Sequence, residues 1–99
     1  MYTYRAKKIR CVDGDTVDFE VDLGFRMYAR IRTRLTDVDT PERGEADFNR
    51  ATAMLENLLA FQADEEGWIT ISTGKTGKYG RWLVTIGGVN EVLAKIWPY

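Results

Sequence analysis

Hydrophobic and polar side chains alternate with a period of two through much of the first third of the chain. From Thr16 to Asp22, three apolar residues alternate with three acidic ones, as expected of a half-buried β-strand. Met27 to Leu35 alternates in the same way, with a row of arginines on one face. A further strand is predicted from Tyr4 to Cys11, and Leu23 to Arg26 is predicted to form a turn because it contains a glycine.

The period then changes from two to that of a helix. Within Glu45 to Ala60, apolar residues recur three or four positions apart, which predicts an amphipathic helix. Its apolar face comprises Phe48, Ala51, Leu55 and either Leu58 or Leu59.

Two more strands are predicted after this helix, from Trp68 to Ser72 and from Arg81 to Ile86, joined by the glycine-rich segment GKTGKYG. A short helix is predicted from Val89 to Trp97. The order of three strands, a helix and two strands favours a mainly β fold with helices, a five-stranded OB-type Greek-key barrel. An SH3-like barrel or an α+β sandwich would accept a similar order. The residues assigned to the core are Phe19, Ile31, Leu55, Leu58 and Trp82.

Length and composition limit the kinds of metal site and catalytic mechanism that the chain could support. The 99 residues predict one domain, residues 1–99. The single cysteine, Cys11, cannot form an intrachain disulfide, and the chain has no histidine. Zinc sites built from cysteine and histidine, and mechanisms with an imidazole base, are therefore excluded. Any metal would have to be held by oxygen atoms.

The ends and the apolar segments predict a soluble protein. The first residues, MYTYRAKK, have no apolar core of the kind that a signal peptide needs, and no apolar run approaches membrane-spanning length. A cytoplasmic location without a membrane partner is therefore expected.

Charge is distributed unevenly although the formal net charge is only −1. Met1 to Arg34 holds eight basic and five acidic residues, and Ile69 to Tyr99 holds four basic and one acidic. Leu35 to Trp68 holds two basic and nine acidic residues. Because the chain is not basic overall, any nucleic-acid binding must depend on a local patch.

The acidic segment contains an unusual concentration of like charge. Thr36 to Glu42, with the sequence TDVDTPE, places three carboxylates within seven residues. Aspartate, threonine and proline are ordinary turn formers, so a solvated turn is one interpretation. The other is that a bound cation offsets the repulsion.

Four short motifs combine carboxylates, arginines and turn residues. Each has an ordinary interpretation by itself, since DGDT is typical of a turn between strands and GKYG of a hairpin tip. The motifs are VDGDT with Asp13 and Asp15, the strand end at Arg34, DTPE with Asp39, Thr40 and Glu42, and KYGR with Lys78, Tyr79 and Arg81.

Taken together, these motifs resemble the staphylococcal (micrococcal) nuclease family. The resemblance appears as IRCVDGDTV, RLTDVDTPE, GKYGRWL and VNEVLAK, in that order and with compatible gaps. It covers most of the chain. The joint occurrence of the four segments is far more specific than any one of them.

The resemblance implies a calcium ion held by Asp15, Asp39 and the backbone carbonyl of Thr40, and all-oxygen ligation suits this hard cation. Asp13 falls at a more peripheral acidic position near the metal.

The resemblance also implies a division of catalytic roles. Glu42 corresponds to the general base that acts on the attacking water. Arg34 and Arg81 correspond to the two arginines that hold the phosphate, which guanidinium groups can bind bidentately. Lys78 and Tyr79 correspond to contacts with a neighbouring phosphate of the substrate.

The expected function is calcium-dependent, sugar-non-specific hydrolysis of DNA or RNA to 3′-phosphate products, with single strands as the expected substrate. The alternative is a catalytically inactive OB-fold module that binds single-stranded nucleic acid or a protein partner. Compared with larger family members, the loop after DTPE is shortened to about RGEAD and the chain stops at IWPY. Arg30 and Arg32 would either extend the phosphate track or form a solvated ridge.

Overall fold

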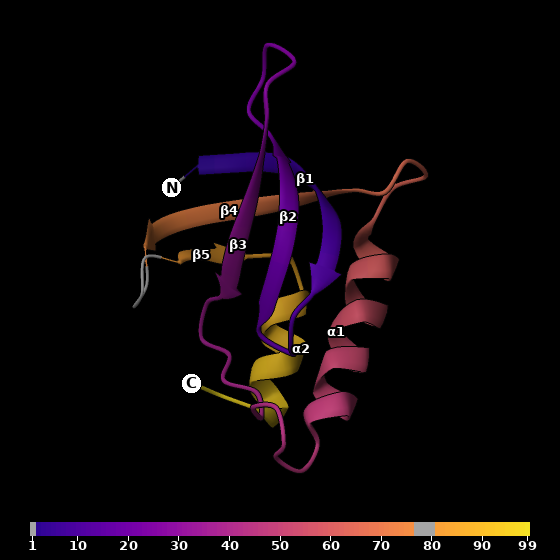
Figure 1. Ribbon diagram of the computed structural model, residues 1–99, viewed down its shortest axis with the longest axis vertical. Coiled ribbons are helices and arrows are strands. Elements are labelled where there is room, and N and C mark those ends of the chain that lie inside the picture. The colour runs from indigo at the N-terminus through magenta and orange to yellow at the C-terminus, as the bar shows by residue number, and fades with distance from the viewer. Residues whose placement is uncertain (1, 77–80) are drawn as a thin grey trace.

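A computed structural model describes residues 2–76 and 81–99 of the chain, and the order of its elements is the predicted one. The two helices lie at one end, and the hairpin between the second and third strands projects from the other (Figure 1). The elements are β1 Tyr2–Cys11, β2 Thr16–Asp22, β3 Tyr28–Leu35, α1 Phe48–Gln62, β4 Trp68–Thr76, β5 Trp82–Thr85 and α2 Val89–Ile96.

The strands form a closed barrel in the order β1-β2-β3-β5-β4. Strands β3 and β5 are parallel, whereas the other neighbouring strands are antiparallel. The barrel with its two helices confirms the predicted OB-type α+β fold. No helix of the described residues is long and apolar enough to cross a membrane.

Two element boundaries differ from the prediction by three or more residues, and the others by no more than two. Helix α1 begins three residues late because Glu45 to Asp47 form turns, in which Asp47 adopts a left-handed backbone with φ of 66°. Strand β4 runs past the predicted end at Ser72, because the backbone of Thr76 pairs with Trp82 across an irregularity in the ladder.

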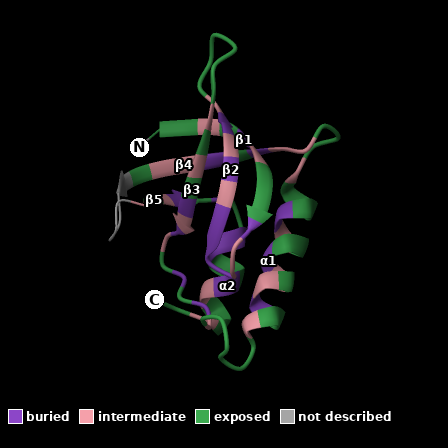
Figure 2. Ribbon diagram, in the orientation of Figure 1, coloured by how far each residue is buried: buried purple, intermediate pink, exposed green. Residues whose placement is uncertain are grey.

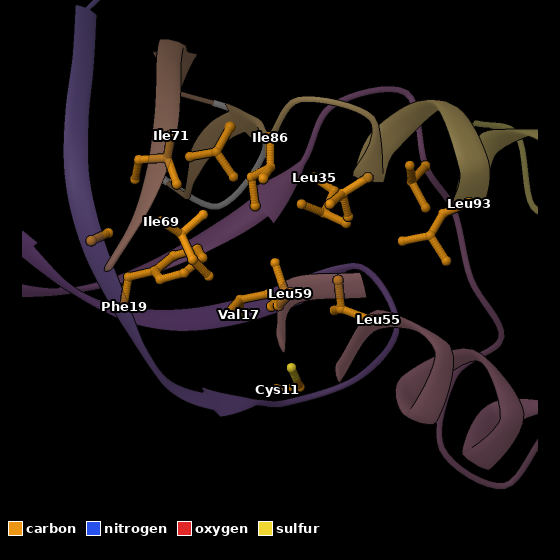
Figure 3. Packing of buried hydrophobic residues seen from close by; sticks show 14 of the residues in the cluster. Cys11, Val17, Phe19, Leu35, Leu55, Leu59, Ile69, Ile71, Ile86 and Leu93 are labelled. Atoms are coloured by element: carbon orange, nitrogen blue, oxygen red, sulfur yellow. The ribbon is translucent and has the colours of Figure 1, made fainter. Parts of the chain in front are cut away.

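The core lies where the helices meet the barrel. Leu55 and Leu59 of α1 and Leu93 of α2 point toward Val17 and Leu35 of the barrel (Figure 3), and all five side chains are almost fully buried. The outward surfaces of the helices are exposed, as is the tip of the β2–β3 hairpin (Figure 2). The helical period therefore predicted the correct inner face of α1.

The assignment of residues to the core is correct for Phe19 and Leu55, which are buried, while Ile31 and Leu58 are half-buried and pack against the core. It is wrong for Trp82, which is 43% exposed. Trp82 lines the open end of the barrel, away from the helices that close the other end.

Asn90 at the start of α2 joins the ends of β3 and β5. Its side-chain oxygen accepts a hydrogen bond from the backbone nitrogen of Ile86 at 2.9 Å. Its amide nitrogen donates to the carbonyl oxygens of Thr36 at 2.9 Å and of Val84 at 3.1 Å. Because Asn90 is buried, these bonds fix α2 and the end of β3 relative to each other.

Candidate functional site

The side chain of Asp15 lies at the centre of the predicted site. Asp15 is 6% exposed and is the last residue of the turn between β1 and β2. Its Oδ1 accepts a hydrogen bond from the hydroxyl of Thr16 at 3.0 Å. Its Oδ2 accepts one from the backbone nitrogen of Thr40 at 3.1 Å and one from Nη2 of Arg34 at 3.3 Å.

The pKa of Asp15 is raised from 3.8 to about 6, and burial is the largest cause. The neighbouring carboxylate of Asp13 also raises it, whereas the backbone N–H of Thr40 and the charge of Arg34 lower it without restoring the ordinary value. The negative charge of Asp15 is therefore only partly compensated by the protein.

Arg34 connects the two carboxylates that were predicted to bind metal. Its Nη2 lies 3.3 Å from Oδ2 of Asp15 and 3.4 Å from Oδ1 of Asp39. The guanidinium carbon also lies 5.2 Å from the centre of the Tyr99 ring, an arrangement that allows a cation–π interaction. Arg34 is thus held between two acids and an aromatic ring, with its side chain 16% exposed.

The loop that carries Asp39 is held in place by backbone hydrogen bonds on both sides. The nitrogen of Leu35 donates to the carbonyl of Asp15 at 2.8 Å, which ties the end of β3 to the β1–β2 turn. The nitrogen of Asp39 donates to the carbonyl of Trp97 at 3.0 Å, and the nitrogen of Tyr99 donates to the carbonyl of Asp37 at 3.2 Å. The last residues of the chain therefore support the loop from outside.

Thr40 is packed tightly against the β1–β2 turn. An added Cβ at Gly14 would lie 2.8 Å from the Cγ2 and Oγ1 atoms of Thr40 and from the Cβ of Ala51. Only a glycine leaves room for this approach. This close packing of Thr40 against Gly14 holds the DTPE segment beside the carboxylate of Asp15.

The donor set of this cluster fits a hard cation. Asp15 and Asp39 supply carboxylate oxygens, and the backbone carbonyl of Thr40 is the third donor that was predicted. The hydroxyl oxygen of Thr40 is buried and has no hydrogen-bond partner among the described residues. In those residues no group of three or more His, Cys, Asp and Glu side chains could hold a metal, so backbone oxygen and water would have to complete a coordination shell.

Glu42 lies near this cluster but does not contact it. Its carboxylate is exposed and has no hydrogen bond or ion pair within residues 2–76 and 81–99. Its backbone nitrogen donates to Oε1 of Glu45 at 2.6 Å. Glu42 shares the lining of one open surface pocket with Asp39 and Thr40, so its carboxylate is free to approach a ligand bound there.

The remaining predicted residues lie on or next to β5. Arg81 is half-buried and directly precedes β5, whose first residue, Trp82, pairs with Thr33, the neighbour of Arg34 in β3. The register thus brings Arg81 to the strand that carries Arg34. Lys78 and Tyr79 lie outside the described residues.

The arginine ridge of β3 is partly neutralised by β2. Arg32 forms a two-point ion pair with Asp18, with Nε–Oδ1 and Nη2–Oδ2 distances of 2.8 and 3.0 Å. Hydrogen bonding to Arg32 lowers the pKa of Asp18, so this pair is charged at neutral pH. Arg30 is exposed beside Glu20, its cross-strand neighbour. Of the two interpretations of the ridge, the geometry at Arg32 favours a solvated one.

Sequence reasoning missed Tyr99. The sequence separation between Tyr99 and Arg34 is large, and their contact depends on how the end of the chain docks. An isolated bridge between Val38 and Pro98 directs this docking. No local pattern indicates it, although a proline followed by an aromatic residue at the end of a helix was a visible feature.

No protein-family model matches the chain, whereas known proteins are similar to it. A protein named micrococcal nuclease from Shigella flexneri is 34% identical over 80 residues, which cover 81% of this chain and 40% of that protein. Protein ParB of Escherichia coli is 34% identical over 90 residues, covering 91% and 45%. The similarity supports a nuclease-like relationship. The chain spans less than half the length of either relative.

The raised pKa of Asp15 predicts how stability depends on pH in the metal-free protein. Because the folded pKa of about 6 exceeds the ordinary 3.8, the folded state binds this proton more tightly than the unfolded state. The associated stability is present at low pH and is lost as pH rises through about 6. Relative to Asp15→Asn, the wild type should therefore lose free energy of unfolding between about pH 4 and about pH 7.

Urea unfolding of both proteins in a chelator, over a series of pH values, measures this difference. Comparison with Asp15→Asn cancels the titration of the other carboxylates, including the oppositely shifted Asp18. If the difference in free energy of unfolding between the wild type and Asp15→Asn stays constant from about pH 4 to about pH 7, or changes in favour of the wild type as pH rises, the environment described for Asp15 is contradicted.

Proposed function

We propose that this domain is a calcium-dependent nuclease that hydrolyses phosphodiester bonds of DNA or RNA without sugar specificity and leaves 3′-phosphate ends. The observation that carries the proposal is the contact cluster of Asp15, Arg34 and Asp39 beside Thr40. It combines two carboxylates for a cation with a guanidinium for a phosphate. The similarity to a protein named as a nuclease supports the same conclusion.

The chain's own residues divide the work of hydrolysis. Arg34 and Arg81 bind the non-bridging oxygens of the phosphate, where negative charge changes in the transition state. Arg34 is well suited to this because the ring of Tyr99 and two carboxylates hold it in one orientation. Glu42, whose carboxylate is exposed and unengaged, accepts a proton from the attacking water.

Asp15, Asp39 and the carbonyl of Thr40 would hold the calcium ion. When bound, calcium supplies positive charge next to the scissile phosphate and polarises its oxygens. The buried carboxylate of Asp15 supports this assignment, because its raised pKa reports negative charge that the protein compensates only in part. The buried and unbonded hydroxyl of Thr40 supports it as well.

The proposed partner is single-stranded DNA or RNA. Two basic side chains of the described surface are already paired with carboxylates, since Arg32 is bound to Asp18 and Nη1 of Arg50 lies 3.5 Å from Oδ2 of Asp47. We therefore propose a compact site that binds a short stretch of the sugar-phosphate backbone. For single strands, each neutralised phosphate makes the slope of log affinity against log salt concentration more negative by roughly 0.7. Because few phosphates are bound, this slope should be shallow.

Cleavage of single-stranded DNA tests the proposal directly. The wild type should cleave in calcium and should not cleave in EDTA. Glu42→Gln should lower the rate by about 10²-fold or more, the usual contribution of a positioned acid or base. Glu56→Gln, which removes an exposed carboxylate on α1, is the matched control and should cleave like the wild type. If the wild type does not exceed Glu42→Gln, the domain is an inactive binding module instead.

Two substitutions at the cluster should have different effects, one on the calcium requirement and the other on the cleavage rate. Asp39→Ala removes a proposed metal ligand and should raise the calcium concentration needed for cleavage. Arg34→Ala should lower the rate by about 10²-fold or more, as when one preorganised donor to the transition state is lost, while calcium affinity is kept or increased. Calcium titrations of the cleavage rate separate the two effects, with Arg26→Ala on the exposed hairpin as the control. Loss of calcium affinity in Arg34→Ala would argue against its phosphate role.

A further inference from the structure

The open end of the barrel contains an apolar pocket that the proposed chemistry does not use. Its volume is about 310 Å³, within the range of small-molecule sites, which often occupy the mouths of β-barrels. Aromatic side chains line its rim, namely those of Tyr2, Tyr4 and Trp82. Ile31 and Ile71 lie deeper, and Ile71 is 1% exposed.

The pocket lies next to the proposed phosphate-binding arginines. Thr33 and Trp82, which both line it, form the first pair of the β3–β5 ladder. The residues next to them in sequence are Arg34 and Arg81. Because side chains alternate between the two faces of a strand, Arg34 points to the face opposite Thr33.

The barrel wall ends at this same pair of residues. In the described part of the chain, residues 28–32 of β3 pair only with β2, and the ladder to β5 begins at Thr33. The arginines and the pocket therefore lie on opposite faces of the same strand ends. A strand bound at both would have its phosphate at the arginines and another part in the pocket.

The chemistry of the lining favours a planar aromatic group. The hydroxyl of Thr33 donates to the carbonyl of Val17 at 2.9 Å, and that of Thr73 donates to the carbonyl of Tyr2 at 3.4 Å. These donors are already used, so the pocket offers mainly aromatic and aliphatic surfaces. Such surfaces bind any base by stacking, without reading its hydrogen-bonding edge.

We propose that the mouth of the barrel is a nucleobase subsite, in which Trp82 stacks on a base of the strand whose phosphate lies at Arg34 and Arg81. The subsite rests on the proposed function for the presence of that strand. It would add affinity for nucleic acid without sequence preference. It also accounts for Trp82, a large aromatic residue that the fold leaves 43% exposed.

Binding of two oligonucleotides of equal length tests the subsite. One is a short oligothymidylate, and the other carries the same phosphodiester backbone without bases. In calcium, a Glu42→Gln protein should bind the thymidylate more tightly than the abasic strand. Trp82→Ala in the same background should reduce this preference by about 5- to 150-fold, the usual effect of losing one stacking residue, and leave abasic affinity unchanged. Trp82→Phe, which keeps a ring, should retain most of the preference.

Phe61→Ala is the matched control, since it removes an exposed aromatic ring from α1, away from the mouth. Circular dichroism checks that each variant is folded. A preference for bases that survives in Trp82→Ala, or equal binding of the two strands by the Glu42→Gln protein, would overturn the subsite and leave the nuclease proposal standing. If the Glu42→Gln protein binds neither strand, the proposed function itself fails.

Discussion

Burial of the Asp15 carboxylate is the constraint on which the rest of the site depends. The β1–β2 turn places this acid beside the DTPE segment, where it is 6% exposed. Among the described residues it meets one cation, Arg34, together with the backbone N–H of Thr40 and the hydroxyl of Thr16. Removing a charge from water is costly unless it is fully compensated. The raised pKa of Asp15 shows that compensation is incomplete. A site that has surplus negative charge beside a guanidinium is suited to a cation and a phosphate together, because each supplies the charge that the other requires.

The fold produces this arrangement through a few close contacts. Gly14 lets Thr40 and α1 approach the turn, and the backbone bond between Leu35 and Asp15 aligns the end of β3 with it. Asn90 fixes α2 to the strand ends, and α2 in turn carries the final residues back to the acidic loop. Because the supporting residues belong to buried or strand-paired parts of the chain, Asp15 and Arg34 are held by rigid elements, as preorganised charge stabilisation requires. Asp39 lies on a loop, and its backbone is supported by the hydrogen bond to Trp97.

The sequence predicted the order of elements well because period-two and helical patterns both report which face of an element is buried. Local patterns were less informative about where elements begin and end and about how deeply individual side chains are buried. Helix α1 starts late because Asp47 takes a left-handed turn conformation, which aspartate tolerates but does not require. Trp82 was wrongly assigned to the core. Alternation shows which face of a strand points inward, but it does not show whether other side chains cover that face near the end of the barrel. The burial of Asp15 and the contact of Tyr99 with Arg34 both arise from docking of distant segments, so the turn signature of DGDT could not reveal them.

The proposed site binds a cation and a phosphate cooperatively. Isothermal titration of a nucleotide 3′,5′-bisphosphate into the protein, with and without calcium, tests this claim most directly. Calcium should raise the affinity for the bisphosphate by roughly 5- to 150-fold, the usual range of coupling between sites, and the bisphosphate should raise the affinity for calcium by the same factor. Equal bisphosphate affinities in the two titrations would contradict a shared site at Asp15, Arg34 and Asp39.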